Sequence, residues 1–225
     1  LFRSNFEYYS EDGFLSGEMS AYEVAAIEEK GVGVVMKHFA LNDSEQDRIG
    51  LGVWVNEQAA REIYLKAFQA PVEKGNANGV MIAYTRWGCI WSGGSKPLVT
   101  GILREEWGCD GLIITDNVLT TYVNGVDGVL AGVSTFDAML PYVTKQLPDY
   151  KNDAVIVNAM REACHRNLYA IANSSGMNGI GKDTEIKDTG LLVVDVVRTL
   201  LIVFGALFVL SLVMWITRKR RFKKN

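Results

Sequence analysis

The chain has 225 residues, of which 48% are hydrophobic and 22% charged, and its formal net charge at pH 7 is −3. This composition excludes general disorder, and the length allows one large domain or two small ones. Six basic side chains lie in residues 218–225 and leave −9 on residues 1–217, so the body is too acidic for a nucleic-acid-binding surface.

Short apolar runs alternate with stretches of helical spacing along residues 1–172, which we treat as one domain. Helices are predicted over 16–30, 57–73, 99–107, 117–131 and 153–172, and buried strands over 32–39, 79–84 and 111–115. Such alternation is typical of parallel strands covered by helices. Both an open doubly wound sheet and an eight-stranded barrel fit it. The fold class expected is therefore α/β. Only three or four strand–helix units are visible, so its barrel form would be a partial (β/α)8 TIM-like barrel.

A polar, glycine-rich linker is predicted over 173–190, followed by a single transmembrane helix over 191–217. Eighteen uncharged residues at 199–216 would span about 27 Å as a helix, close to the hydrocarbon thickness of a bilayer. A buried core helix is the alternative, but it would rarely lack charge over this length or end in six cations. By the positive-inside rule the basic tail at 218–225 is cytoplasmic, and residues 1–190 lie outside the cell membrane.

Several chemistries find no support in the sequence. Cys89, Cys109 and Cys164 form no CxxC pair and are odd in number, which argues against a metal site and against a disulfide framework. No glycine-rich phosphate loop follows any predicted strand, so nucleotide binding has no support. No metal and no organic cofactor is therefore expected.

Polar and charged side chains gather where the three predicted strands end. They are Lys37, His38, Asn42, Glu45 and Arg48 after the first strand, Tyr84, Thr85 and Arg86 after the second, and Asp116 after the third. In a barrel these ends meet on one rim, where a lone carboxylate among cations and donors would suit a polyhydroxylated ligand.

Each of these residues also has an ordinary explanation. Asp116 could cap a helix, and His38 could be a satisfied core histidine. Glu45 and Arg48 could form a surface i,i+3 pair. Taken by themselves, the residues leave the two interpretations about even.

Ordered blocks of the chain resemble motifs of glycoside hydrolase family 3. Residues 5–12 are similar to its NFEY-x-SEDP entry, and residues 35–48 to its KHF-x-x-N-x-x-E-x-x-R segment. Residues 61–68 are similar to its RE-x-YL-x-x-F helix, and residues 81–84 to its M-x-x-Y strand. Residues 103–116 are similar to its LR-x-x-WG-x-x-G-x-[VI]-[ST]-D block. The resemblance covers residues 1–141. It implies a β-glucosidase-like enzyme with a barrel catalytic domain that acts on a β-glycoside or oligosaccharide.

The resemblance also implies roles for individual residues. The Asp that closes the last block is the family's nucleophile, which corresponds to Asp116. The Lys-His pair and the strand Tyr bind the sugar, which corresponds to Lys37, His38 and Tyr84. Arg48 in the first block and Arg3 in the entry segment are assigned as further substrate-binding residues.

The implied mechanism is retaining, with Asp116 attacking the anomeric carbon and a second carboxyl group about 5–5.5 Å away acting as acid and then base. In this family that group usually comes from a separate α/β sandwich domain, which is not visible here. Because the chain begins at Leu1 and not at Met, we expect a C-terminal fragment. Some members of the family have the reversed domain order, and a membrane span directly after the barrel fits that order. The sandwich domain would precede the barrel, no acid/base residue is named, and the isolated chain is expected to be inactive.

Departures from the family pattern motivate a rival interpretation. Asn117 stands where the family usually has an aromatic residue, Thr85 where it has Asn, and Gly13 where it has Pro. Residues 131–140 resemble a stretched AG-x-D-x-M segment. The rival is a non-catalytic, membrane-tethered sugar-binding or structural relic of the same fold.

Overall fold

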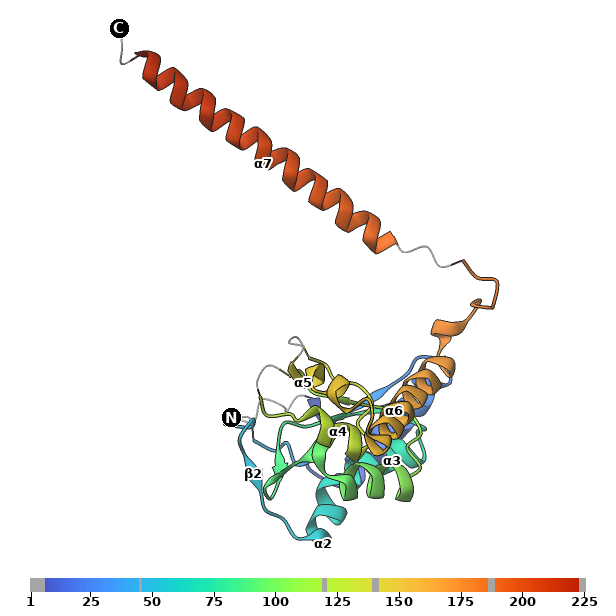
Figure 1. Cartoon of the computed structure of the whole chain (residues 1–225). Coiled ribbons are helices and arrows are strands. Elements are labelled where there is room, and N and C mark those ends of the chain that lie inside the picture. The colour runs from blue at the N-terminus through green and yellow to red at the C-terminus, as the bar shows by residue number, and fades with distance from the viewer. Residues whose placement is uncertain (1–6, 45, 119–120, 139–141, 186–188, 223–225) are drawn as a thin grey trace. The chain divides into compact units, whose positions relative to one another are not determined.

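The computed structural model describes residues 7–44, 46–118, 121–138, 142–185 and 189–222 (Figure 1). The chain divides into two compact units, Leu1–Asn178 and Gly179–Asn225. Arg3 and Glu45, two residues singled out from the sequence, lie outside the described residues.

A three-stranded parallel sheet forms the centre of the first unit. It contains β1 (Val35–Phe39), β3 (Gly79–Ile82) and β6 (Leu112–Thr115) in the order β1-β3-β6. The strands predicted from apolar, β-branched runs are therefore confirmed, each with fewer residues than expected. A parallel bridge between Ile114 and Thr135 continues the sheet beyond β6. These strands form an open sheet within the described part of the chain, and the partial barrel stays a prediction.

Helical segments follow each strand of this sheet. The described helices of the first unit are α1 (Gly13–Glu28), α2 (Glu57–Ala59), η2 (Ala60–Tyr64), α3 (Lys66–Glu73), η3 (Ser92–Gly94), η4 (Pro97–Glu106), α4 (Gly125–Ala131), α5 (Tyr142–Lys145), η5 (Leu147–Tyr150), α6 (Ala154–Ala172) and η6 (Ser175–Met177). The predicted helix at 57–73 is present as three consecutive segments, and Asn56 caps it by accepting a hydrogen bond from the Ala59 amide at 2.8 Å.

The helix predicted over 117–131 is wrong in its first half. The α4 helix begins only at Gly125, because Asn124 caps it by accepting the Val126 amide at 3.0 Å. Directly after Asp116 the chain instead continues extended, and the Val118 amide donates to the Asp137 carbonyl at 2.7 Å. Asp116 therefore does not cap a helix, which removes the ordinary explanation for this carboxylate.

Aromatic and aliphatic side chains fill the space between the sheet and its helices. Phe39 of β1 is fully buried, and its ring packs edge-to-face on Phe68 of α3 at 5.3 Å and on Trp107 at 6.0 Å. Helix α1 lies against α3, where a Cβ atom at Gly17 would come within 3.0 Å of the Lys66 carbonyl oxygen. This core holds the strand ends that carry the candidate site.

A second sheet was not predicted from the sequence. It joins β2 (Gly52–Val53), β4 (Arg86–Trp87) and β5 (Ile90–Trp91), with β2 and β4 parallel and β4 and β5 antiparallel. Strands of two residues are too short to leave a recognisable pattern of alternation. Arg86 belongs to this sheet, where its guanidinium donates to the Cys89 carbonyl at 3.3 Å.

Arg104 ties the start of β6 to the segment that follows α4. Its guanidinium donates to the carbonyl oxygens of Cys109 at 3.0 Å, Gly111 at 3.1 Å and Gly132 at 2.9 Å. Three bonds from one planar cation fix these carbonyls in space. The amino end of the strand that leads to Asp116 is thereby anchored.

The second unit contains one long helix, α7 (Thr189–Phe222), drawn in red in Figure 1. Within it, Val193–Ile216 forms a 24-residue stretch of mean hydropathy 2.6 whose side chains are exposed. By length and composition this helix could cross a membrane. The predicted span at 191–217 falls inside α7.

Candidate active site

Asp116 follows β6 at the carboxyl edge of the parallel sheet. Its amide donates to the Ile82 carbonyl at 3.0 Å, which holds the residue beside the end of β3. One carboxylate oxygen, Oδ1, accepts the Asn117 amide at 2.7 Å. The other, Oδ2, is buried and has no hydrogen-bond partner among the described residues. The Asp116 carboxylate is thus held through Oδ1, while Oδ2 accepts no hydrogen bond from the described residues.

His38 lies next to that Oδ2 atom. Its Nε2 atom is 3.6 Å from Asp116 Oδ2, and the two side chains are 8% and 14% exposed. Burial lowers the pKa of His38, and the nearby Asp116 carboxylate opposes this shift without reversing it. His38 is therefore neutral at pH 7. Its backbone amide donates to the Tyr8 hydroxyl at 3.3 Å.

Tyr84 closes the site from the end of β3. Its hydroxyl donates to the Asn117 carbonyl at 2.6 Å. Burial, reinforced by the Asp116 carboxylate, raises the pKa of Tyr84 to about 12, so the phenol remains protonated. The Arg48 guanidinium lies over its ring, with Cζ 4.3 Å from the centroid, and the Tyr122 ring packs edge-to-face at 4.9 Å.

Lys37 forms an ion pair with an acidic side chain near the start of the described chain. Its Nζ atom pairs with Glu7 Oε1 at 3.0 Å, and its side chain is 42% exposed. The peptide bonds Lys37–His38 and Phe39–Ala40 are both cis. Of the residues predicted for the site, the structure therefore brings His38, Tyr84, Arg48 and Asp116 together, and it pairs Lys37 with Glu7. Arg3 is outside the described residues.

Sequence reasoning missed three residues that contact this group. Glu7 pairs with Lys37, Tyr8 accepts the His38 amide, and Tyr122 packs on Tyr84. Glu7 and Tyr8 lie in the segment that resembles the family's entry motif, so that motif was a usable signal. Tyr122 follows the nucleophile block at a position without a recognisable pattern.

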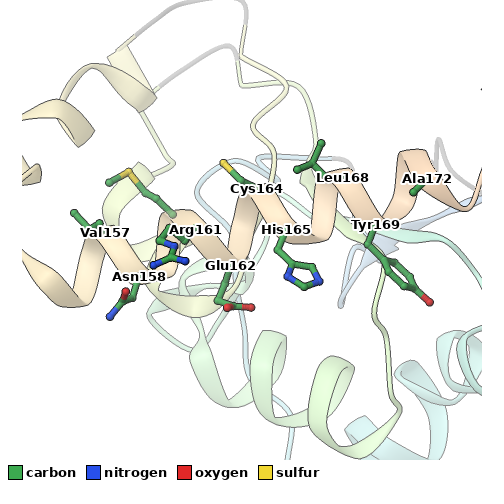
Figure 2. A pocket seen from close by; sticks show the side chains of 10 residues that line it. Val157, Asn158, Arg161, Glu162, Cys164, His165, Leu168, Tyr169 and Ala172 are labelled. Atoms are coloured by element: carbon green, nitrogen blue, oxygen red, sulfur yellow. The ribbon is translucent and has the colours of Figure 1, made fainter. Parts of the chain in front are cut away.

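The rest of the described chain offers no competing centre. No group of three or more His, Cys, Asp or Glu side chains among those residues is placed to hold a metal ion. A hollow lies along α6, between side chains such as Arg161, His165 and Tyr169, and none of the residues predicted for the site lines it (Figure 2). The carboxyl edge of the parallel sheet is therefore the candidate active site.

Residues 4–137 match the model of the glycosyl hydrolase family 3 N-terminal domain. The chain belongs to this family. It is 45% identical over 112 residues to a β-glucosidase of Ruminococcus albus and 34% identical over 186 residues to a probable β-glucosidase I of Emericella nidulans, which is 81% of this chain. The structure resembles β-glucosidase 3B of Thermotoga neapolitana with a TM-score of 0.71 and 31% identity over 78% of this chain.

These relatives are much longer than the part that is matched. The alignments cover 12% of the Ruminococcus enzyme, 22% of the Emericella protein and 26% of the Thermotoga chain. The likeness therefore establishes the family and the α/β fold of this part.

Proposed function

We propose that this chain carries the nucleophile of a β-glucosidase-like retaining glycoside hydrolase, and that Asp116 is that nucleophile. The single observation that supports this most strongly is the Asp116 carboxylate itself. One oxygen is held by a backbone amide at 2.7 Å, and the other is buried, unpartnered and next to a neutral histidine. Buried polar atoms are nearly always hydrogen-bonded, and a catalytic role is one of the recognised reasons for an exception.

The proposed chemistry follows from that oxygen. Asp116 Oδ2 attacks the anomeric carbon of a bound β-glycoside, a glycosyl ester forms, and the bond to the leaving group breaks with its electron pair going to the leaving oxygen. His38, Tyr84 and Arg48 surround the ring, and Lys37 and Arg3 bind hydroxyls at its margin. Water then hydrolyses the ester and regenerates the carboxylate.

The second carboxyl group of the mechanism is assigned to no residue of this chain. A sandwich domain that precedes the barrel and supplies this group remains a prediction. On that basis the chain by itself does not turn over glycosides with poor leaving groups, because their departure needs a proton. No step of the proposal uses a metal or an organic cofactor.

The experiment that tests the nucleophile avoids the need for that proton. The full chain in detergent is incubated with 2,4-dinitrophenyl 2-deoxy-2-fluoro-β-D-glucoside, whose leaving group departs unprotonated, and labelled peptides are mapped by mass spectrometry. We expect one glycosyl adduct on Asp116 and none in Asp116→Asn. The control Asp110→Asn, which changes an exposed carboxylate 2.5 Å from Arg166, should still be labelled. A label on another residue contradicts the assignment.

The rival function, a non-catalytic sugar-binding relic, predicts a different result in the same experiment. It gives binding of glucose without any covalent adduct. The position of Asp116 at the end of the block that resembles the family's nucleophile motif favours the enzyme. The unpartnered oxygen of Asp116 is compatible with both functions, because a carboxylate can accept from sugar hydroxyls as well as attack an anomeric carbon.

We further propose that α7 anchors the protein in the cell membrane. In this arrangement residues 1–172 form the catalytic part of a partial barrel outside the cell, and residues 173–190 link it to the span at 191–217. The basic tail at 218–225 is cytoplasmic. The exposed apolar stretch at Val193–Ile216 and the parallel order of the central strands support these assignments.

A further inference from the structure

Five residues of the described chain have buried polar side-chain atoms that lack a hydrogen-bond partner. These atoms are His38 Nδ1, Asn42 Nδ2 and Oδ1, Asp116 Oδ2, Asn117 Oδ1 and Tyr142 Oη. Buried polar groups in folded proteins nearly always have a hydrogen-bond partner. Three of these residues belong to the site already described, which makes the other two informative.

Asn42 differs from the rest because neither of its amide atoms is satisfied. The residue is 7% exposed, so water outside the protein does not hydrate it freely. An apolar side chain of the same volume would avoid the cost of this desolvation. The amide is therefore kept at the expense of stability, which points to a function.

Asn42 lies shortly after the end of β1, in a segment that is bonded to the residue after Tyr84. It follows His38 by four positions, and the Ala40 carbonyl between them accepts a hydrogen bond from Thr85 Oγ1 at 2.8 Å. Thr85 in turn directly follows Tyr84. Leu41 has a φ of 65°, which non-glycine residues rarely adopt, and it turns the chain immediately before Asn42.

We propose that Asn42 is a further substrate-binding residue, whose Nδ2 donates to one hydroxyl of the glycosyl ring and whose Oδ1 accepts from the adjacent one. An amide is the side chain that offers a neutral donor and an acceptor side by side, which matches a pair of vicinal hydroxyls. This inference rests on the proposed function and specifies its substrate: a pyranoside with both hydroxyls, in preference to the corresponding deoxy sugars.

The test measures the rate at which 2,4-dinitrophenyl 2-deoxy-2-fluoro-β-D-glucoside and its 3-deoxy, 4-deoxy and 6-deoxy analogues label Asp116. With the parent compound, Asn42→Ala should lower the second-order labelling rate by about tenfold, as expected for one or two lost hydrogen bonds. With the analogues that lack the hydroxyls bound by Asn42, the loss should largely disappear. Asn42→Asp, which keeps the acceptor and loses the donor, should also label more slowly. The exposed control Asn152→Ala should label like the wild type.

A second variant separates binding from folding. Asn42→Leu removes both unpartnered atoms, so its melting temperature should equal or exceed that of the wild type while its labelling falls as in Asn42→Ala. The role of Asn42 is overturned if Asn42→Ala lowers the labelling rate equally with every analogue, or lowers it with none. A lowered melting temperature of Asn42→Leu also overturns it. An unlabelled wild type instead overturns the proposed function, so the two failures are distinguishable.

Discussion

His38 Nε2 and Asp116 Oδ2 approach to 3.6 Å although their strands are not neighbours in the sheet. The strand β3 lies between β1 and β6, so the two backbones are about 9.6 Å apart, twice the usual strand spacing. The side chains therefore meet over the carboxyl end of β3, where Tyr84 follows. This contact buries the His38 imidazole beside the Asp116 carboxylate.

Protonation of His38 should destabilise the folded protein. Burial lowers its pKa from the ordinary value of 6.5, so the unfolded chain binds this proton more readily than the folded one. Stability from the neutral imidazole is complete above pH 6.5 and is lost as the pH falls through the lower folded-state pKa. We expect the free energy of unfolding to decline more steeply from pH 7.5 to 5 in the wild type than in His38→Gln, measured by urea denaturation. Parallel curves would contradict this.

Tyr84→Phe should weaken the site without removing its aromatic packing. The change deletes the 2.6 Å bond to the Asn117 carbonyl, while the ring that Arg48 covers remains. We expect a loss of about 0.5–1.5 kcal/mol in stability and a slower labelling of Asp116. Calorimetry and the labelling assay check the two effects. Tyr22→Phe, at a side chain that is exposed, serves as the control and should change neither.

Thr85→Val should be costly despite conserving shape. The Thr85 side chain is fully buried and donates to the Ala40 carbonyl at 2.8 Å, so valine leaves that carbonyl without a partner. The expected loss is about 1–3 kcal/mol in the free energy of unfolding. Thr121→Val, at an exposed residue, should change it by less than about 0.5 kcal/mol. A loss at Thr85 no larger than at Thr121 would refute the importance of this bond.

Two glycine-to-alanine changes should act in opposite directions. At Gly111, just before β6, a Cβ atom would lie 1.9 Å from the Asn78 carbonyl oxygen, which is backbone and cannot rotate away. At Gly101, inside η4, nothing lies within 4 Å of that position. Gly111→Ala should destabilise by about 1–3 kcal/mol, while Gly101→Ala should stabilise by about 0.5–1 kcal/mol. Thermal denaturation of both variants decides this, and a stabilised Gly111→Ala would be evidence against the close contact.

An arginine in the middle of α7 should impair membrane insertion. Leu207 lies within the apolar stretch Val193–Ile216, and an arginine at the centre of a span costs about 2.5–3.5 kcal/mol on the scale derived from insertion experiments. We expect the wild type to resist carbonate extraction and Leu207→Arg to be released in part. Ile180→Arg, outside the stretch, should behave like the wild type. Extraction of the wild type itself would count against anchoring.

Local patterns in the sequence predicted much of the fold. Apolar β-branched runs identified the three central strands, and helical spacing identified the helix at 57–73, because these signals depend on neighbours along the chain. The second sheet and the late start of α4 depend on contacts between distant segments. The bond from Val118 to Asp137 is one of these, and no local pattern reveals it.

The sequence predicted which residues lie near one another better than it predicted the contacts between them. The family motifs identified Asp116, His38 and Tyr84, which do lie together. They did not predict that Lys37 turns to Glu7, because that pairing joins residues thirty positions apart. Nor did they distinguish Asn42 from an ordinary strand-end residue, since the absence of partners is visible only once the chain is folded.

The anchoring of β6 by Arg104 has a consequence for engineering. Arg104 holds the Cys109 and Gly111 carbonyls, which precede the strand, and the Gly132 carbonyl after α4, whereas the carboxylate of Asp116, the proposed nucleophile, follows the other end of the strand. Substitutions after Asp116 should therefore leave the strand in place, because Arg104 holds its other end. Randomised libraries should leave Arg104 untouched and concentrate their diversity beyond position 116.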